Sequence, residues 1–369
     1  GQAYAIRALC YLNLATWFSR APYNSLTGAS RWNEPCVPVY TTGTSIDTGG
    51  QPRESLRTVY GRIDQDIDRA IELLEKARET TLAENNKSHI NLYVALGIKS
   101  RACLAEGDWD GAFKAAKRVI DEGGYAVGTK SDLTSGMNSL DKQNVMWGAG
   151  IQVADQAGGY AGFFTHMDNK EGAYAKSAPK LISKQLYNRI SATDIRRDWW
   201  DPSDKESPYV SKKFSFANVA SFLGDYIYMR VEEMYFTAAE AALRLDDLKS
   251  ARELMNTVMA ERDPGYSANN RSGTLLGATT TTWTGSFLEN ILTHRRIELW
   301  GEYGRLFDVR RLGQGIDRRT DDGFSEECIS MMNRRNVNIT KADTYDWVLT
   351  IPKAELDANP NINEEDQNP

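Results

Sequence analysis

Two stretches of this chain repeat one pattern, and that repeat limits the possible folds more than any other feature. Residues 101–112 and residues 240–251 each read as an alanine-containing helix that ends at a polar turn. In each stretch an aspartate, Asp108 or Asp247, stands where it can cap the start of a second helix. Small and large apolar residues on two helices joined by a tight turn are typical of tetratricopeptide units, which are about 34 residues long. The sequence therefore predicts a mainly α-helical protein built from helix pairs.

Four such pairs can be traced along the chain. They predict a helical scaffold at about residues 2–20, 55–122, 229–262 and 286–312. The pairs are not in tandem, because segments rich in Gly, Ser, Thr and Pro separate them at about residues 21–52, 123–225 and 263–285. Irregular segments of that length are uncommon in a compact domain unless they serve a function. We expect one domain over residues 1–369, an α–α superhelix with large irregular insertions that carry the ligand site.

The run at residues 294–313 combines many charges of both signs with bulky apolar residues. If the run is helical, its charges stand three or four positions apart and pair with each other along one stripe. An ordinary surface helix has no need of so many ion pairs beside so many apolar groups. The pattern predicts a helix packed on both sides, with a structural, semi-buried ion-pair motif made of Arg296, Glu298, Glu302, Arg305 and Asp308.

Composition narrows the class of protein. The chain is 41% hydrophobic and 25% charged, values of a soluble globular protein. Its net charge is −6, and its basic runs each lie near acidic residues, so no nucleic-acid partner is expected. No segment approaches the roughly 20 apolar residues of a membrane span. The first residues show no signal peptide, which leaves open a cytoplasmic protein or one whose targeting segment has been removed.

Signatures of catalysis and of metal binding are weak. The chain has no Gly-x-Ser-x-Gly elbow and no phosphate-binding glycine loop. Its three histidines are far apart, and the calcium-loop-like Asp64-x-Asp66-x-Asp68 has Arg69 where such a loop needs glycine. A glycosidase needs two carboxylates across a cleft, and fifty acidic residues make such a pair uninformative. We predict no metal, no cofactor and no catalytic residue.

Aromatic residues in the irregular segments suggest ligand binding instead. Flat rings stack on the apolar faces of sugar rings, and polar side chains beside them bind the hydroxyls. Trp32-Asn33, Asp198-Trp199-Trp200 and Trp283 have that make-up, and these six residues are the predicted ligand-binding residues. Because Trp199 and Trp200 are adjacent, an extended backbone would point them to opposite sides, so we expect at most one of them to face a ligand. The other interpretation is that these rings form the core of an insertion.

The order of several motifs resembles one family. Residues 3–14 followed by Ala21-Pro22-Tyr23 resemble the opening helix of the SusD/RagB proteins, which are outer-membrane nutrient-binding lipoproteins of Bacteroidetes. Residues 295–313 resemble that family's charged signature, with Tyr303 in place of its usual glycine. The C-terminal Ile351-Pro352, Asn359-Pro360 and Gln367-Asn368 resemble its final motif, and the matches run in family order over essentially the whole chain.

The resemblance implies a function that the residues alone do not give. It implies capture of a nutrient, usually an oligosaccharide, at the outer face of the outer membrane, and delivery to a TonB-dependent transporter of the SusC type, without catalysis. The helices would form the scaffold that meets the transporter. The family's lipid anchor and first helical segment have no counterpart in these residues, so contact with the membrane is expected only through an anchor that this chain lacks. The alternatives are a tetratricopeptide scaffold that binds peptides and, less favoured, a glycoside hydrolase.

Overall fold

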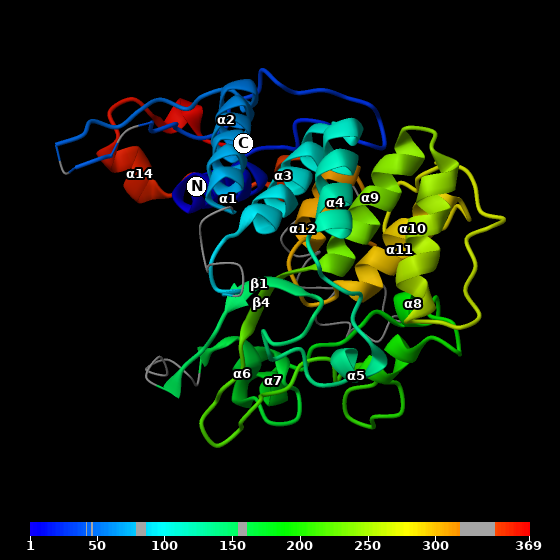
Figure 1. Cartoon of the computed structure of the whole chain (residues 1–369). Helices are drawn as coiled ribbons and strands as arrows, with labels where there is room; N and C mark the ends of the chain where they lie inside the picture. Colours follow the sequence, from blue (N-terminus) through cyan, green and yellow to red (C-terminus); the bar gives the residue numbers. More distant parts are fainter. Residues whose placement is uncertain (42, 46, 79–85, 154–160, 318–343) are drawn as a thin grey trace.

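Helices that pack in sequence order form one side of the protein. The computed structural model describes residues 1–369 except 42, 46, 79–85, 154–160 and 318–343. Helix α1 packs on α2, α3 on α4, α4 on α9 and α9 on α10 (Figure 1). Their bounds are Gln2–Phe18 (α1), Leu56–Arg78 (α2), Leu92–Glu106 (α3), Trp109–Glu122 (α4), Val231–Arg244 (α9) and Leu248–Ala260 (α10). The predicted fold class, mainly α with helix pairs and large insertions, is confirmed.

The two repeated stretches fold in the same way. Asp108 caps α4 by accepting a hydrogen bond from the backbone N–H of Gly111 at 3.0 Å. Asp247 caps α10 in the same manner, from the N–H of Ser250 at 3.0 Å. A side-chain cap of this kind satisfies one of the backbone donors left free in the first turn of a helix. The sequence signal for a tight turn between paired helices was therefore correct at both places.

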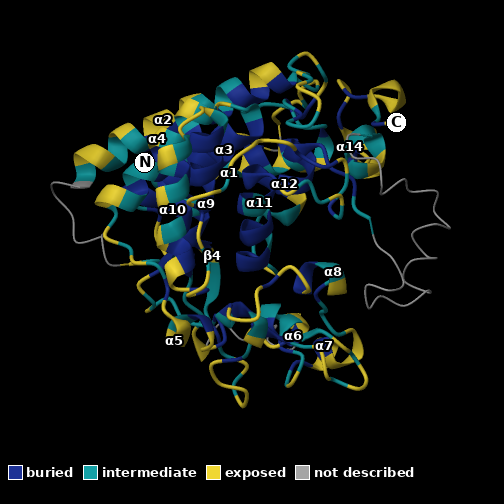
Figure 2. Ribbon diagram, turned by 90° about the vertical axis from the view of Figure 1, so that its right-hand side faces the viewer, coloured by how far each residue is buried: buried dark blue, intermediate teal, exposed yellow. Residues whose placement is uncertain are grey.

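The centre of the scaffold lies at α3 and α9. Nearly every residue of these two helices is buried, as Figure 2 shows for the dark ribbons at the middle of the bundle. A helix buried on all sides needs apolar or paired residues around its whole circumference. In α9 the carboxylates of Glu232, Glu233 and Glu240 fill such positions, and each is paired with arginine. Among the described helices, none is long and apolar enough to cross a membrane.

The long insertion at residues 123–225 forms a second body beside the helices, drawn in green in Figure 1. Strand β1 pairs antiparallel with β4, and β2 with β3, so each sheet has two strands. Because β4 runs directly into α9, the first sheet joins the insertion to the scaffold. The elements of this region are α5 (Lys130–Leu133), β1 (Val145–Ala149), α6 (Phe163–Met167), α7 (Ala173–Ser177), α8 (Lys184–Tyr187), η3 (Ile195–Trp199), β2 (Trp200–Asp201), β3 (Val210–Ser211) and β4 (Tyr226–Arg230).

The charged run after residue 294 is not one helix. Helix α11 (Phe287–Glu298) ends at Glu298, and α12 (Arg305–Leu312) begins only after a turn. Gly301 and Gly304 in this turn have φ values of 75° and 111°, a region that glycine adopts without the clash of a Cβ atom. The predicted helical spacing of Glu298 with Glu302 is therefore wrong, and both residues pair with distant partners instead.

The C-terminal residues close the scaffold against its N-terminal end. After η5 (Tyr345–Trp347) and α14 (Lys353–Ala358), the chain ends at η6 (Glu364–Asp366), close to α1 and α2 in Figure 1. The amide of Asn359 donates to the carbonyl of Gln51 at 2.9 Å, and that of Asn368 donates to the carbonyl of Phe18 at 2.9 Å. Arg53 donates to Asn368 at 2.9 Å. The C-terminal asparagines thus act as structural residues that fix the loop before α2.

Candidate ligand-binding site

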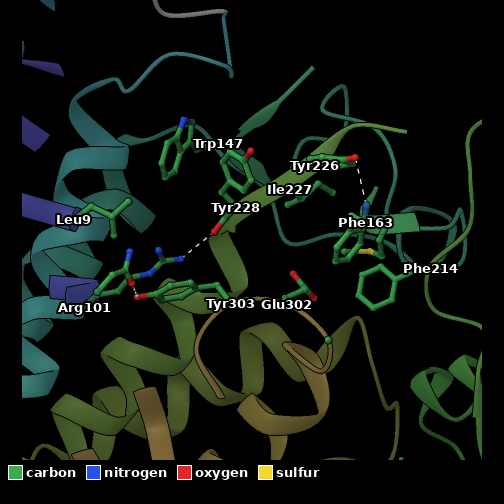
Figure 3. Close-up of a pocket in the computed structure, with 13 residues that line it drawn as sticks. Leu9, Arg101, Trp147, Phe163, Phe214, Tyr226, Ile227, Tyr228, Glu302 and Tyr303 are labelled. Atoms are coloured by element: carbon green, nitrogen blue, oxygen red, sulfur yellow. Dashed lines mark hydrogen bonds between the residues drawn. The ribbon is translucent and has the colours of Figure 1, made fainter. Parts of the chain in front are cut away.

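A pocket of about 480 Å³ lies where the first sheet meets the scaffold (Figure 3). We call it the aromatic pocket. Its walls come from α1, α3, β1, β4, the insertion and the turn between α11 and α12. It is lined by Leu9, Asn13, Arg101, Met137, Trp147, Phe163, Phe214, Tyr226, Ile227, Tyr228, Gly301, Glu302 and Tyr303.

Aromatic rings form the upper wall. Trp147 on β1 and Tyr228 on β4 pack edge to face, with their ring centroids 5.0 Å apart and their planes at 68°. Tyr228 is 41% exposed, and Trp147 is half-buried, so both present part of a ring to the pocket. In Figure 3 these two rings lie side by side above Arg101 and Tyr303. Partly exposed rings with polar groups nearby suit a ligand that has an apolar face and a hydroxylated edge.

The polar end of the pocket is held in place by hydrogen bonds. Arg101 binds both carboxylate oxygens of Glu233, at 2.8 and 2.7 Å, and donates to the carbonyl of Tyr228 at 3.0 Å. Its guanidinium also lies 4.0 Å from the ring centroid of Tyr303. The hydroxyl of Tyr303 donates to Asn13 at 3.0 Å, which ties the turn after α11 to α1. These contacts fix Arg101, Tyr303 and Asn13 before a ligand binds, and we call this end of the pocket its floor.

Burial and neighbouring charges together set the pKa values of the side chains on this floor. Burial raises the pKa of Tyr303 above its ordinary value, so the phenol stays neutral and remains a hydrogen-bond donor. Burial alone would disfavour the charge of Arg101, but the adjacent Glu233 carboxylate raises its pKa, so the guanidinium stays charged. Burial likewise opposes the charge of Glu302, yet Arg230 and Lys213 lower its pKa. The pocket thus combines neutral rings with charges that already have partners.

Beneath the pocket lies a fully buried group of charges that we call the Glu298 network. The Glu298 carboxylate accepts from Arg196, Arg230 and Arg262 at 2.9–3.1 Å, and all these side chains have no exposed surface. Glu232 pairs with Arg230 and Arg262, and Glu302 pairs with Arg230. Asp194 and Lys213 extend the network into the insertion. Because its members come from both parts of the protein, this network joins the insertion to the scaffold.

One known protein family matches more than half of this chain. A family model described as the SusD family matches residues 167–369, more than half of the chain. The chain belongs to the SusD family. Among curated proteins none matches this chain.

Solved structures share the fold over the whole length of the chain. A SusD-like carbohydrate binding protein from Bacteroides vulgatus is 26% identical, with a TM-score of 0.76 over 99% of this chain and 76% of that one. A SusD superfamily protein from Bacteroides thetaiotaomicron is 24% identical, with a TM-score of 0.76 over 100% of this chain and 77% of that one. The surface glycan-binding protein A from Bacteroides uniformis is 17% identical, with a TM-score of 0.59, and covers 100% and 76%. The last two likenesses show the fold alone.

The adjacent tryptophans of the predicted site are part of the core of this SusD-family protein. Trp199 is 2% exposed and Trp200 is 1% exposed, and both pack among Leu186, Ile190 and Ile297. Trp199 ends the 3₁₀ helix η3 and donates to the carbonyl of Leu133 at 2.8 Å. We expected at most one of these rings to face a ligand, and neither offers an open face for stacking. The alternative interpretation, core of the insertion, fits their surroundings.

The other predicted ligand-binding residues are scattered. Trp32 is half-buried against Tyr60, beside an exposed Asn33, in the loop that precedes α2. Trp283 is half-buried, with the Arg189 guanidinium 4.4 Å from its ring. Asp198 and Trp200 line a separate pocket that is described below. None of the six lines the aromatic pocket, and the structure brings only Asp198 and Trp200 together in one pocket.

The predicted ion-pair motif is correct in part. Glu298 and Glu302 belong to the Glu298 network, and Asp308 accepts from Arg295 and Arg311 at 2.9 Å each. One member does not fit, because Arg305 has no ion-pair partner among the residues that the structure describes. Arg296 is half-buried and donates to the carbonyl of Thr280 at 3.1 Å. The turn at residues 299–304 removes the predicted helical spacing of Glu302 with Arg305, whereas Arg305 and Asp308 lie together on α12 and still form no ion pair.

Proposed function

We propose that this protein captures an oligosaccharide at the cell surface and passes it, chemically unchanged, to a TonB-dependent transporter of the SusC type. Membership of the SusD family supports the capture role, and two proteins of the same fold are described as carbohydrate binding and as glycan binding. The proposed location is the outer face of the outer membrane, with attachment through a lipid anchor. The proposed partners are the glycan and the transporter.

The observation that carries the proposal is the pairing of Trp147 with Tyr228 at the wall of an open pocket. A sugar ring placed against these rings covers apolar C–H groups with aromatic carbon, while its hydroxyls reach Asn13 and Tyr303 at the pocket end. Binding by such contacts needs no reacting group. It is the chemistry of capture and release.

Hydrolysis of the glycan has no support in this pocket. A glycosidase places two carboxyl groups on either side of the bond that it cleaves. Among the residues that line the aromatic pocket, Glu302 alone has a carboxylate, and Arg230 and Lys213 already bind it. A carboxylate held by two cations is a poor general acid because its pKa is lowered. We therefore propose a binding protein and not an enzyme.

Isothermal titration with neutral hexasaccharides tests the proposal. β-1,4-Glucan, β-1,4-mannan, β-1,4-xylan and α-1,4-glucan fragments serve as the panel. We expect saturable binding of at least one class, recovery of intact sugar, and at least about a tenfold loss of affinity in Tyr228→Ala. Tyr174→Ala is the matched control, because Tyr174 is also an exposed tyrosine of the insertion but lies outside the pocket. Equal affinity in the wild type and in Tyr228→Ala would remove the aromatic pocket from the proposal.

A further inference from the structure

A second pocket, of about 420 Å³, lies in the insertion on the other side of the 212–214 segment. We call it the polar pocket. Lys212 lines it, whereas Phe214, two residues later, lines the aromatic pocket. Trp200 and Trp300 pack edge to face in between, with centroids 5.9 Å apart, and Trp300 also stacks on Phe214. The packed rings of Trp200, Trp300 and Phe214 thus connect the wall of one pocket to the wall of the other.

Charges of both signs line the polar pocket in equal number. Three are basic and three are acidic: Lys130, Arg197, Lys212, Asp194, Asp198 and Asp201. Several of them already have partners, since Lys212 lies 3.7 Å from Asp201 and Asp194 pairs with the buried Arg196 at 2.6 Å. A balanced lining of this kind attracts neither anions nor cations strongly. It suits a neutral ligand with many hydrogen-bonding groups.

Two groups of this lining have no partner. Asp198 is exposed, and no described residue pairs with its carboxylate. The indole N–H of Trp200 has no hydrogen-bond partner, although only 1% of the residue is exposed. Because this nitrogen is itself buried, a ligand in the pocket does not reach it. The pocket therefore offers Asp198 as an acceptor, and Lys130 and Lys212 as donors, to a hydroxylated ligand.

The wall that bears these groups is rigid. Asp194 and Arg196 are fully buried beside η3, and Arg196 binds Glu298 of α11 at 3.1 Å. Arg197 donates to the carbonyl of Ile190 at 2.7 Å and lies 4.4 Å from the ring centroid of Tyr187. A site held in this way loses little conformational entropy when a ligand binds.

We infer that the polar pocket is a second binding site for a neutral sugar ring, which it holds by hydrogen bonds to Asp198 and from Lys130 and Lys212 and not by stacking. Stacking is excluded because Trp200 and Tyr187 are both buried and present no open ring face. The inference rests on the proposed capture of a glycan. It adds that the protein engages its ligand at two places of different chemistry.

Fluorine NMR of protein labelled with 5-fluorotryptophan reads the two pockets separately. The chain has nine tryptophans, of which Trp147 lines the aromatic pocket and Trp200 the polar pocket. Their lines are assigned with Trp147→Phe and Trp200→Phe. In a titration with the neutral hexasaccharides, we expect both lines to shift, with midpoints that differ because the two sites bind with different strength. In Asp198→Ala only the Trp200 shift is expected to be lost.

The outcomes distinguish the two proposals. If the Trp147 line shifts while the Trp200 line stays fixed at millimolar sugar, the inference about the polar pocket is overturned and the proposed function stands. If neither line shifts, the proposed function itself is overturned. Glu206→Ala is the control, since Glu206 is an exposed carboxylate of the neighbouring loop that does not line the pocket. A loss of the Trp200 shift in this control as well would overturn the role of Asp198.

Discussion

The aromatic pocket and the polar pocket differ in their walls but share their support. Partly exposed rings of Trp147 and Tyr228 line the aromatic pocket, whereas charged side chains such as Asp198 line the polar pocket. Below both lies the Glu298 network, which reaches the first pocket through Glu302 and the second through Asp194. The side chains that line the two pockets therefore differ in kind, whereas the same buried ion pairs support the geometry of both.

The largest expected effect comes from removing the shared support. Glu298→Ala leaves three buried arginines without their common carboxylate, and breaking a buried ion pair in this way costs about 3–5 kcal/mol. We expect a corresponding fall in the free energy of unfolding, measured by urea denaturation. The ligand-induced shifts of the Trp147 and Trp200 fluorine lines should weaken together under conditions where part of the protein unfolds.

Arg305→Ala is the control for that prediction. Arg305 lies in the same charged run but has no ion pair with a described residue, so we expect a loss below about 1 kcal/mol. A loss as large as that of Glu298→Ala would contradict the assignment of the network. A damaged aromatic pocket beside an intact polar pocket in Glu298→Ala would contradict the shared support.

A smaller effect is expected from Glu106, a half-buried carboxyl that, unlike the network, forms no ion pair with a described residue. One of its oxygens is buried and has no hydrogen-bond partner in the part of the chain that the structure describes. Burial, together with the nearby Asp64 and Asp108, raises the pKa of Glu106 from 4.5 to about 8. Between these values the folded protein keeps a proton that the unfolded chain has released, so this group lowers stability as the pH rises from about 4.5 to about 8.

Glu106→Gln should remove that pH dependence. We expect the variant to gain about 1–2 kcal/mol over the wild type at pH 9 and to match it near pH 5, where both side chains are neutral. Urea denaturation at the two pH values measures the difference. An equal gain in stability at pH 5 and at pH 9 would contradict this prediction, because it would show that ionisation of the unpaired Glu106 carboxyl is not the cause.

The scaffold could be predicted from the sequence because its signals are local. Asp108 and Asp247 each stand three residues before the backbone N–H that they cap, so a short window contains the whole interaction. Where a local rule was extended too far, the prediction failed. Glu298 and Glu302 look like neighbours on a helix, but the glycines of the turn between α11 and α12 break it.

The aromatic pocket could not be predicted in the same way. Arg101, Trp147, Tyr228 and Tyr303 lie on four segments far apart in the sequence, and only the β1–β4 pairing and the helix packing bring them together. Composition alone could not separate a stacking site from a core at Trp199 and Trp200, since rings beside Arg and Asp occur both in ligand sites and in cores with buried ion pairs. The alternation of tyrosines at Tyr226 and Tyr228 was a usable signal for a strand with one exposed ring.

A crystal structure of the protein with the hexasaccharide that binds in titration would locate the ligand directly. The account predicts an intact sugar chain with one ring against Trp147 and Tyr228 and hydroxyls within hydrogen-bonding distance of Asn13 and Tyr303. A sugar bound only outside the aromatic pocket, or one cleaved at a glycosidic bond, would contradict the account.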